Sequence, residues 1–595
     1  MRKLNPSRDC PLPFGGLGWS RFGGYAHYQF HKENTVSVET LKEQSNGLRG
    51  AIPIELMEPT PSFSEDMTKL LKFHGIYQQH DRDIRGRNNR HYQFMVRSKI
   101  PGGRLTAQQY LVHDALADEF SQGDLRLTTR QGIQFHGVAK GDIKPTLRAL
   151  NDVLVSTLGA CGDVERNIMF CPAPFGDPLR VKIQSVAETL AQHLAPRTPW
   201  YHQIWLQDEE TGKQVLQRFD DVEVNEPIYG KTYLPRKFKT AIAFPGDNCV
   251  DILTNDLGLV AIFEEGSEEL QGFNLFVGGG MGQNHTDEDT FPKLAELMGY
   301  APLEKIVDVA EKVIMVQRDF GNRENRARAR LKYLIHERGI DWFRAKVEEY
   351  LGYSLEESRP MPEWSTDDHL GWHQQVDGHW FIGIYVENGR VRDVEDQRIR
   401  SGLRKIIQRF NPSVVITPQQ NIILGGLRGD DRAAVDEILA EFGIRSVEQL
   451  SLVRRNAMAC PALPSCGLAL SEAERYLPSL IDQIEEIVEE LGLGKEEFAV
   501  RMTGCPNGCA RPYMADIGLV GRTLGKYNLY FGGNMEGTRM NQLYKELIPS
   551  ADLPTTIRNV LKSYVNTRQP GERVGDWAAR VGVETIDSLL EGWVI

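Results

Sequence analysis

The sequence predicts an α+β protein that is duplicated along its chain, each copy a small α+β unit followed by a larger lobe. Three pairs of segments recur in the same order: 127–138 with 416–427, 255–260 with 515–520, and 273–282 with 527–537. Their shared order makes chance a poor explanation. Homologous halves commonly pack about a pseudo-two-fold axis, so we expect a ligand at their junction.

The composition excludes several classes of protein. With 595 residues the chain is too long for one hydrophobic core and predicts three or four domains. A net charge of −12 argues against a protein that wraps nucleic acid. No apolar run approaches a membrane span, and the N-terminus lacks the apolar region of a secretory signal. The scattered cysteines do not resemble a disulfide framework, so we expect a reducing, cytoplasmic compartment, or a plastid in a photosynthetic eukaryote.

The N-terminal parts carry few readable signals. Residues 1–35 are rich in glycine and aromatic residues without a period, which we interpret as an N-terminal arm. Residues 36–90 are expected to wrap the body and to include a helix beginning at Ser37 or Thr40. Their basic stretch at 81–90 is expected to be a solvated loop.

The first small unit, residues 91–158, alternates between strand and helix patterns. The expected elements are a strand at 92–100, a turn at 101–103, a helix at 106–120, a strand pair at 125–131 and 132–138, and a helix at 143–158. The later parts are expected to be a first lobe at 159–358, a second small unit at 359–430 and a second lobe at 431–595.

Half of the eight cysteines lie in two short motifs of the second lobe. Cys460 and Cys466 form a C-x5-C motif, and Cys505 and Cys509 form a C-x3-C motif. Four thiolates brought together by two turns bind a soft metal or a cluster. The wide, unequal spacing favours a [4Fe–4S] cluster, with a structural zinc or unrelated buried thiols as the alternatives. The other cysteines, Cys10, Cys161, Cys171 and Cys249, are given ordinary structural roles.

A helix is expected between the two cysteine motifs. Ser471 and Glu474 have the spacing of a capping box. Apolar residues then follow at helical spacing from Leu480, and Gly492 ends the helix. Pro478 kinks or restarts it.

The two cysteine motifs, with Thr503-Gly-Cys-Pro-Asn-Gly-Cys509 read as one run, resemble those of the sulfite and nitrite reductase hemoproteins, which pair siroheme with a [4Fe–4S] cluster. The resemblance extends from about residue 45 to about residue 582. It implies two ferredoxin-like half-units that form one sandwich domain, and two larger α+β lobes around a central siroheme and cluster, which the second lobe carries.

The resemblance also implies roles for individual residues. Cys460, Cys466, Cys505 and Cys509 match the cluster ligands, and Cys509 also matches the thiolate that reaches the siroheme iron. A macrocycle with eight acid groups needs many cations and donors when buried. The residues expected to contact siroheme are Arg126, Thr128, Arg130, Gln134, His136, Arg326, Gln420 and Asn507.

On the open face of the siroheme the family places four cations, which match Arg97, Arg166, Lys237 and Lys239. They are expected to bind an oxyanion and to supply protons. Crowding should lower the pKa values of the lysines. Lys239 favours sulfite as the substrate, because nitrite reductases typically carry asparagine there.

The arginines at 323, 326, 328 and 330 have three interpretations: Arg326 reaches the cofactor, the run faces an acidic electron donor, or it is a solvated helix face. The donor is external, since no nucleotide-binding motif is present. Mixed local similarities favour ferredoxin, with the flavoprotein of an NADPH enzyme as the alternative. We expect a monomeric, assimilatory sulfite reductase. The competing hypotheses are a nitrite reductase and a zinc-stapled protein that binds RNA or anions.

Overall fold

Four five-stranded sheets form the frame of the described chain. The computed structural model describes residues 37–84, 90–198, 205–207, 214–216, 226–264 and 269–591. The predicted N-terminal arm at 1–35, with Cys10, and positions 85–89 of the basic stretch lie outside the described residues. Across the described part, no helix combines the length and apolar character needed to cross a bilayer.

The first small unit is an antiparallel sheet with helices packed against it. Its own strands are β1 (Ile76–His80), β2 (Tyr92–Arg97), β4 (Leu125–Leu127) and β5 (Ile133–Val138), and its helices are α4 (Ala107–Phe120) and α5 (Ile143–Asp152). Thr106 caps α4 through a capping box with Gln109, as the pattern predicted a start there. Helix α5 ends six residues before its predicted end because Leu154 takes a left-handed φ of 61°.

The second small unit repeats this design. Its own strands are β13 (Gly371–Gln374), β14 (Trp380–Ile384), β18 (Ser413–Ile416) and β19 (Ile422–Leu427), and its helices are α10 (Ile399–Phe410) and α11 (Arg432–Glu441). Strand β1 of the first unit and helix α11 of the second lie outside the expected bounds of 91–158 and 359–430. Strands β16 (Asp393–Val394) and β17 (Gln397–Arg398) form a short ribbon beside α10. The recurring segments 127–138 and 416–427 therefore occupy equivalent hairpins, and the predicted duplication is confirmed.

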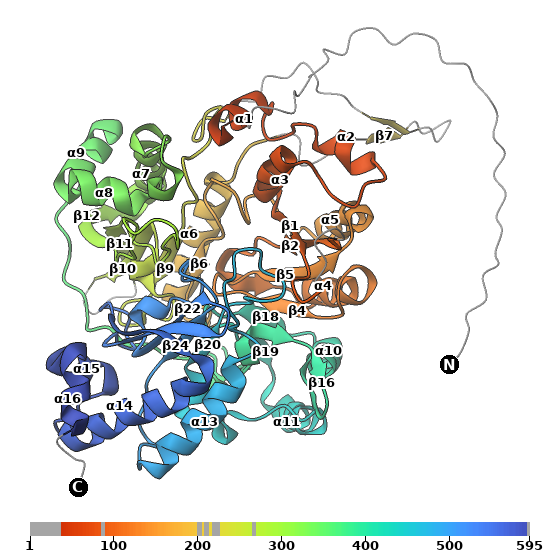
Figure 1. Cartoon of the computed structure of the whole chain (residues 1–595). Coiled ribbons are helices and arrows are strands. Elements are labelled where there is room, and N and C mark those ends of the chain that lie inside the picture. The colour runs from red at the N-terminus through yellow and green to blue at the C-terminus, as the bar shows by residue number, and fades with distance from the viewer. Residues whose placement is uncertain are drawn as a thin grey trace. The chain divides into compact units, whose positions relative to one another are not determined.

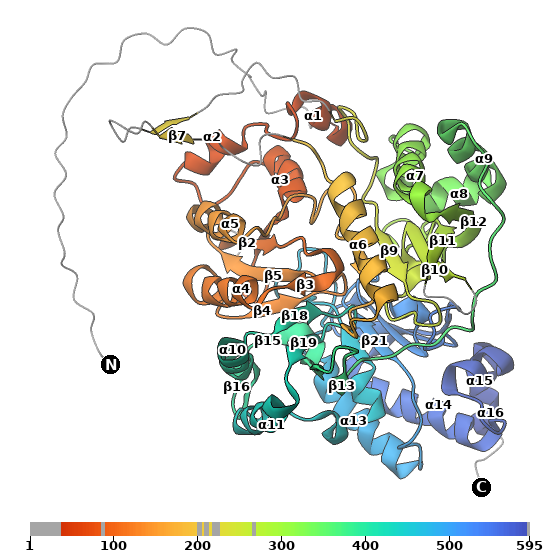
Figure 2. The ribbon, with the colours of Figure 1, turned by 180° about the vertical axis from the view of Figure 1, so that it is seen from behind.

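The two small units exchange their edge strands. β15 (Arg390–Val391), from the second unit, pairs with β4 of the first, so the first sheet runs β1-β2-β5-β4-β15. β3 (Arg104–Leu105), from the first unit, pairs with β18 of the second, whose sheet runs β13-β14-β19-β18-β3. The labels of these strands gather at the contact between the two units in Figure 2. Each sheet is completed only by the other half of the chain.

The two lobes also share one topology. In the first, β6 (Met169–Phe170), β9 (Thr240–Ala243) and β10 (Leu257–Phe263) are parallel, and β11 (Leu270–Val277) and β12 (Glu296–Pro302) follow antiparallel. In the second, the same order is made by β20 (Ala457–Ala459), β21 (Val500–Thr503), β22 (Ile517–Thr523), β23 (Lys526–Phe531) and β24 (Gln542–Pro549).

Helices cover both lobe sheets, as Figure 1 shows. The first lobe has α6 (Pro178–His193), α7 (Ile306–Phe320), α8 (Leu331–Arg338) and α9 (Ile340–Leu351). The second has α12 (Leu452–Arg455), α13 (Leu477–Glu490), α14 (Leu553–Thr567), α15 (Val574–Val581) and α16 (Ile586–Glu591). The remaining elements are α1 (Val38–Gln44), α2 (Ile52–Met57), α3 (Glu65–Leu71), β7 (Trp205–Gln207) and β8 (Gln214–Leu216).

The predicted capping box of the linker helix is wrong. Helix α13 begins at Leu477, with Pro478 in its first turn, three residues after Glu474. Pro478 therefore starts the helix, which proline favours because its missing N–H is not needed there. Glu474 is free to point elsewhere, and it pairs with two arginines of the small units. The predicted end is confirmed, since Gly492 follows the helix with a φ of 69°.

Candidate functional site

Two neighbouring parallel strands bring the cysteine motifs together. β20 and β21 are parallel, with Ala459 opposite Met502, so the segments that follow the two strands leave the sheet at the same edge. Cys460 directly follows β20, and Cys505 follows β21 after one glycine. The Gly504 N–H points to the Cys460 Sγ at 3.4 Å, and the Asn507 side-chain amide to the Cys505 Sγ at 3.4 Å. Both motifs thus present sulfur with N–H donors nearby.

The four thiols act on one another electrostatically. Burial, and then the neighbouring Cys509, raise the pKa of Cys505 to about 12, and the same two causes raise that of Cys460 well above its usual value. Buried thiols that repel each other's charge need a positive core to become thiolates. Among the described residues, these sulfurs do not form a ligand group whose donor atoms all lie within 4.8 Å of one another. A single tetrahedral ion would draw its ligands that close, whereas a multi-iron cluster holds them apart.

The hairpin of the first small unit reaches the cysteine loops directly. Arg126 Nη2 and Gln420 Nε2 both donate to the carbonyl of Ala459, the residue before Cys460, at 2.8 and 3.1 Å. The Thr129 hydroxyl donates to the carbonyl of Cys509 at 3.0 Å. The first small unit supplies Arg126 and the second supplies Gln420. The junction of the two halves therefore lies at the cysteine centre.

The glycine-rich run of the first lobe packs against the second cysteine motif. The Gln283 N–H donates to the Pro506 carbonyl at 2.9 Å. Gly508 has a φ of 62°, and a Cβ there would lie 2.7 Å from the Met281 carbonyl oxygen. Only glycine fits this close approach. The recurring segment 273–282 therefore holds the Cys505–Cys509 turn in place.

Unpaired polar atoms gather around the β4–β5 hairpin. In the described part of the chain, buried nitrogen atoms without a hydrogen-bond partner include Arg126 Nη1, Arg130 Nε and His136 Nδ1. Burial lowers the pKa values of Arg126 and Arg130 to about 10, yet both stay charged at neutral pH. Buried cations and donors with unused valences are costly unless an anionic group completes them. A polycarboxylate macrocycle fits this donor set.

The remaining predicted cofactor residues take several positions. Thr128 Oγ1 accepts the Gly132 N–H at 3.1 Å and holds the hairpin turn. His136 lies 3.3 Å from Gln134 through its Nε2, and burial, with the charge of Arg390, lowers its pKa to about 3. Arg326 is engaged by Asp163, Nη1 to Oδ2, at 2.9 Å. Its contact with a cofactor stays a prediction.

Glu474 is a site residue that the sequence did not identify. Its carboxylate lies 3.2 Å from Arg126 Nε and accepts from Arg390 Nε at 2.6 Å. Burial alone would raise its pKa, but these two arginines lower it to about 2. Arg390 also donates to Asp124 at 3.2 Å. No local pattern could reveal this contact, because its partners come from distant parts of the chain.

Two of the four predicted substrate cations, Arg97 and Arg166, are held by residues 161 and 162. Arg97 Nη1 donates to the Cys161 Sγ at 3.1 Å and feels the charges of Cys509 and Cys466. Cys161 therefore contacts a predicted substrate residue rather than filling an ordinary core position. Arg166 Nε donates to the Gly162 carbonyl at 2.7 Å, which fixes its side chain.

Lys237 and Lys239 differ from every cation described so far. Both are half-buried, and neither ammonium has a hydrogen-bond or ion-pair partner within the described ranges. Burial, followed by the charges of Arg236, Arg330 and Arg166, lowers the pKa of Lys237 to about 7. Burial and the charge of Lys237 lower that of Lys239 well below its usual value. The predicted lowering of both pKa values is confirmed, and two unpaired ammonium groups await an anion.

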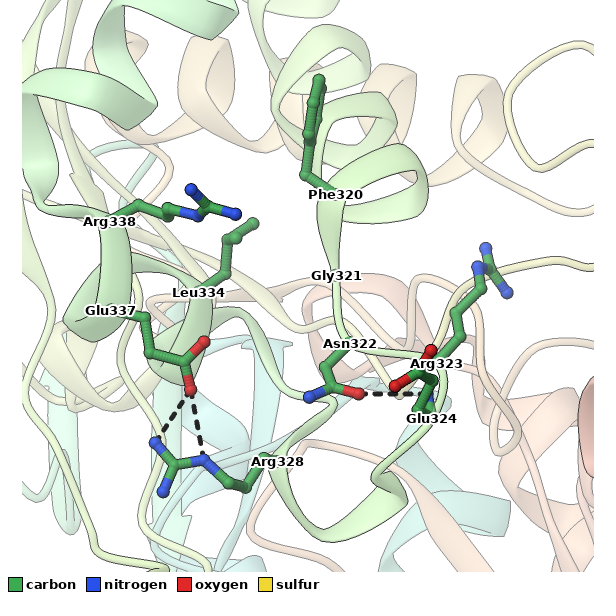
Figure 3. A pocket seen from close by; sticks show the side chains of 9 residues that line it. All are labelled: Phe320, Gly321, Asn322, Arg323, Glu324, Arg328, Leu334, Glu337 and Arg338. Carbon is green, nitrogen blue, oxygen red and sulfur yellow. Dashed lines mark hydrogen bonds and ion pairs between the residues drawn. The ribbon is translucent and has the colours of Figure 1, made fainter.

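The arginine run does not form a helix face. It follows α7 as a loop with a short 3₁₀ turn at Arg326–Arg328, and each arginine finds its own carboxylate. Arg330 is buried against Asp256 at 2.7 Å. Arg323 and Arg328 line one pocket of about 480 Å³. Figure 3 shows Arg328 directed to Glu337 and the Arg323 side chain pointing away from them. The interpretation as a solvated helix face is wrong.

Arg82 belongs to the cysteine centre as well. Its Nη1 donates to the carbonyls of Cys466, at 3.3 Å, and Ala469, at 2.5 Å. Its N–H donates to Pro464 at 3.3 Å. Residues 82–84 form an exposed loop, as expected for the basic stretch, but Arg82 also contacts the loop that carries Cys466.

Two family models match the chain, each of them twice. The model described as "Nitrite and sulphite reductase 4Fe-4S domain" matches residues 185–355 and 453–592. The model described as "Nitrite/Sulfite reductase ferredoxin-like half domain" matches 85–153 and 373–442. The paired matches agree with the duplicated sheets.

Curated relatives match over nearly their whole length. The "Sulfite reductase [NADPH] hemoprotein beta-component" of Staphylococcus saprophyticus is 44% identical over 93% of this chain and 97% of the relative. The protein with the same description from Oceanobacillus iheyensis is 44% identical, over 93% and 96%. Among solved structures, the Mycobacterium tuberculosis NirA protein superposes with a TM-score of 0.75 at 25% identity, over 92% of this chain and 96% of that chain.

Proposed function

Because the chain belongs to the nitrite and sulphite reductase family, we propose that it reduces sulfite to sulfide at siroheme coupled to a [4Fe–4S] cluster. When bound, these groups supply the iron and the path for six electrons, and sulfite loses its three oxygens as water. Family membership selects the cluster over the zinc and thiol alternatives for the four cysteines. It also argues against the hypothesis of a zinc-stapled protein that binds RNA or anions.

The cofactor residues are assigned by their contacts. Cys460, Cys466, Cys505 and Cys509 hold the cluster, with Asn507 and the Gly504 N–H as donors to its sulfur ligands. Arg126, Arg130 and His136, which carry unpaired buried nitrogens, would hold the siroheme carboxylates, joined by Thr128, Gln134, Gln420 and Arg326. Cys509, the exposed cysteine of the four, is the thiolate available to the siroheme iron.

The observation that carries the substrate assignment is the pair of unpaired lysines beside two arginines. A doubly charged oxyanion needs more than one cation, and Arg97, Arg166, Lys237 and Lys239 provide four. Positive charge that is already in place needs no rearrangement when the anion enters. Sulfite therefore fits this site better than singly charged nitrite.

The lysines also deliver protons. Each oxygen that leaves sulfite must be protonated, and a donor works best when its pKa lies near the working pH. Lys237, with a pKa of about 7, meets this condition, whereas an ordinary lysine near 10.5 holds its proton too tightly. Arginine is a poor proton donor, so Arg97 and Arg166 would only bind and orient the anion.

The substrate assignment is tested by Lys239→Asn. The change removes a cation that sulfite uses more than nitrite does, so kcat/KM for sulfite should fall at least tenfold, and that for nitrite less. The measurement is steady-state turnover with reduced methyl viologen, for both anions. Lys182→Asn, on the exposed face of α6, is the matched control and should change neither rate. Equal losses for the two anions would contradict the role given to Lys239.

The electron donor is proposed to be an NADPH-dependent flavoprotein component. The relatives named as NADPH hemoprotein components support this alternative over the ferredoxin that local similarities favoured. The test compares sulfite turnover with NADPH plus such a flavoprotein against turnover with reduced ferredoxin. A higher kcat/KM with reduced ferredoxin would instead support ferredoxin as the donor, as the local similarities suggested. Assembly as a monomer stays a prediction, which gel filtration checks.

A further inference from the structure

A second group of metal-binding side chains lies outside the siroheme and cluster site. Cys171, Asp247, Cys249 and His369 are all buried, and their ligand atoms all lie within 4.8 Å of one another. Cys171 follows β6, Asp247 and Cys249 lie in the turn after β9, and His369 precedes β13. The group therefore joins the first lobe to the second small unit.

The distances within this group match the edges of a tetrahedron around one ion. Cys171 Sγ lies 3.2 Å from Asp247 Oδ2 and 3.8 Å from His369 Nε2, and His369 Nε2 lies 3.4 Å from Asp247 Oδ2. Ligands at 2.0–2.3 Å from a tetrahedral zinc stand roughly 3.3–3.8 Å from one another. Cys249 completes the set as the fourth donor.

The histidine is oriented as a metal ligand is. Its Nε2 faces the cysteine and the aspartate, and its Nδ1 faces the carboxylate of Asp367 at 3.6 Å. Asp367 also accepts the His369 N–H at 2.8 Å, which holds it beside the ring. The 3.6 Å separation is longer than a hydrogen bond, so Asp367 is a nearby carboxylate on the side of the ring where histidine–metal sites commonly carry one.

The charges around the group suit a divalent cation. Two thiolates and a carboxylate carry three negative charges, so a divalent ion leaves one. Arg104 and Arg180 lie near enough to Cys171 for its charge to act on them, and Arg180 stacks on Phe244 with its carbon 4.0 Å from the ring centre. Positive neighbours thus offset the remaining charge.

We propose that Cys171, Asp247, Cys249 and His369 form a structural zinc site that joins the first lobe to the second small unit. Two sulfurs, one imidazole and one carboxylate favour Zn²⁺ over Mg²⁺ or Ca²⁺, which prefer oxygen ligands. All four positions are filled by the protein, so the ion has no open position for a substrate. Binding releases the two thiol protons and leaves no redox change.

The test begins with the native holoenzyme, purified from zinc-containing medium and washed with a weak chelator. Elemental analysis should find one zinc per chain beside the cofactor iron. X-ray absorption at the zinc edge should show two sulfur ligands at about 2.3 Å and two nitrogen or oxygen ligands at about 2.0–2.1 Å. Absence of zinc, or a shell of four sulfurs from zinc at the cluster cysteines, would overturn the proposal.

Variants then locate the ion. His369→Gln and Cys249→Ser should retain less than a tenth of the wild-type zinc while keeping the siroheme spectrum. His113→Gln removes another fully buried histidine, on α4, and should keep its zinc. Zinc that persists in His369→Gln would refute the site. If neither ligand variant folds, the X-ray absorption spectrum of the native protein at the zinc edge still tests the proposed ligand set. Peptide mapping without reductant that found a Cys171–Cys249 disulfide would also refute it.

Discussion

Single residues at this site are held in unfavourable states that only an anion relieves. Among the described residues, Lys237 and Lys239 have no ion-pair or hydrogen-bond partner, and Arg126 and Arg130 have unused donors in buried positions. Such groups reduce the stability of the free protein. These unpaired groups are explained if a polycarboxylate cofactor and an oxyanion substrate both bind at this site.

The lowered pKa of Lys237 has a consequence for the pH dependence of turnover. Below its pKa the ammonium is charged, so it binds sulfite and donates a proton, and above it both abilities are lost. The pKa of about 7 rises again when cofactor and substrate add negative charge. Turnover should therefore decline on an alkaline limb that lies between about 7 and 10.5.

Lys237→Arg tests this assignment with methyl viologen kinetics across pH. Arginine keeps its charge to higher pH, so KM for sulfite should stay within about threefold and the alkaline limb should disappear. Arginine is a poor acid, so kcat should fall at least tenfold. Lys182→Arg on α6 is the matched control. An unchanged alkaline limb in Lys237→Arg would assign it to another group.

Residues that belong to local motifs were predictable, and residues defined by their partners were not. The four cysteines are adjacent to proline and glycine in two short motifs, so both their turns and their chemistry follow from the sequence. Glu474 resembled a helix cap because its spacing to Ser471 is correct. Its actual partners, Arg126 and Arg390, lie far away in the chain, and only the folded structure brings them together.

At the scale of elements, one glycine controls the approach of β15 to Arg126 and Gln420, which we propose as siroheme residues. Gly389 has a φ of 73°, and a Cβ there would lie 2.6 Å from Arg126 Nη1 and 2.8 Å from the Gln420 Cβ. A side chain at position 389 would overlap these two neighbours, so Arg126 or Gln420 would have to move. The turn before β15 therefore positions two cofactor residues.

Gly389→Ala should lower the siroheme content of the purified protein by at least half, measured as visible absorbance per chain. Gly378→Ala is the matched control, since Gly378 has a φ of 85° and open space around its Cβ position. Both variants have similar backbone strain, and only Gly389→Ala meets the cofactor residues. Equal siroheme content in the two variants would show that Arg126 and Gln420 tolerate the displacement.

Long elements were predicted better than the short ones that join the halves. Helix α4 and the β4–β5 hairpin have clear caps and alternation, and the structure contains both. Strand β4 ends at Leu127, four residues before the predicted end at 131, because the chain turns before Gln131, whose φ is 51°. Strands β3 and β15 are two residues long, too short for any periodic pattern, and their partners come from the opposite half. Their pairing depends on tertiary contacts that a local pattern does not contain.

At the scale of the whole molecule, Glu474 links three parts of the chain. It extends from the cysteine-bearing lobe and pairs with Arg126 on β4 and with Arg390 on β15. Its side chain is 11% exposed, so solvent screens these pairs little. Removing one partner of a buried ion pair leaves the others uncompensated.

Glu474→Gln should lower the free energy of unfolding by about 3 kcal/mol at pH 7. The pKa of Glu474 is lowered to about 2 in the folded protein, so its contribution is present above its unfolded value near 4.5. It is lost as the pH falls through about 2. The difference between the urea unfolding midpoints of the variant and the wild type should therefore be smaller at pH 3 than at pH 7. Glu472→Gln, on the surface beside Arg475, serves as control.

The duplicated architecture was predictable from three recurring segments, because equivalent strands need equivalent residues. The sequence did not predict how the copies interlock. The matching sheets of the two lobes and the two small units follow one plan, and some contacts across them recur, since Gln131 donates to Phe170 as Gln420 donates to Ala459. The contact of Arg126 with Ala459 adds to this plan at the cysteine centre.

The exchange of β3 and β15 has a consequence for how the protein is made. A ribosome releases residues 91–158 long before residue 390 exists, so the edge of β4 stays open while the rest is synthesised. An open strand edge is a template for wrong pairing with other chains. The newborn first half should therefore need a chaperone, and siroheme should enter only after the second half has emerged and closed both sheets.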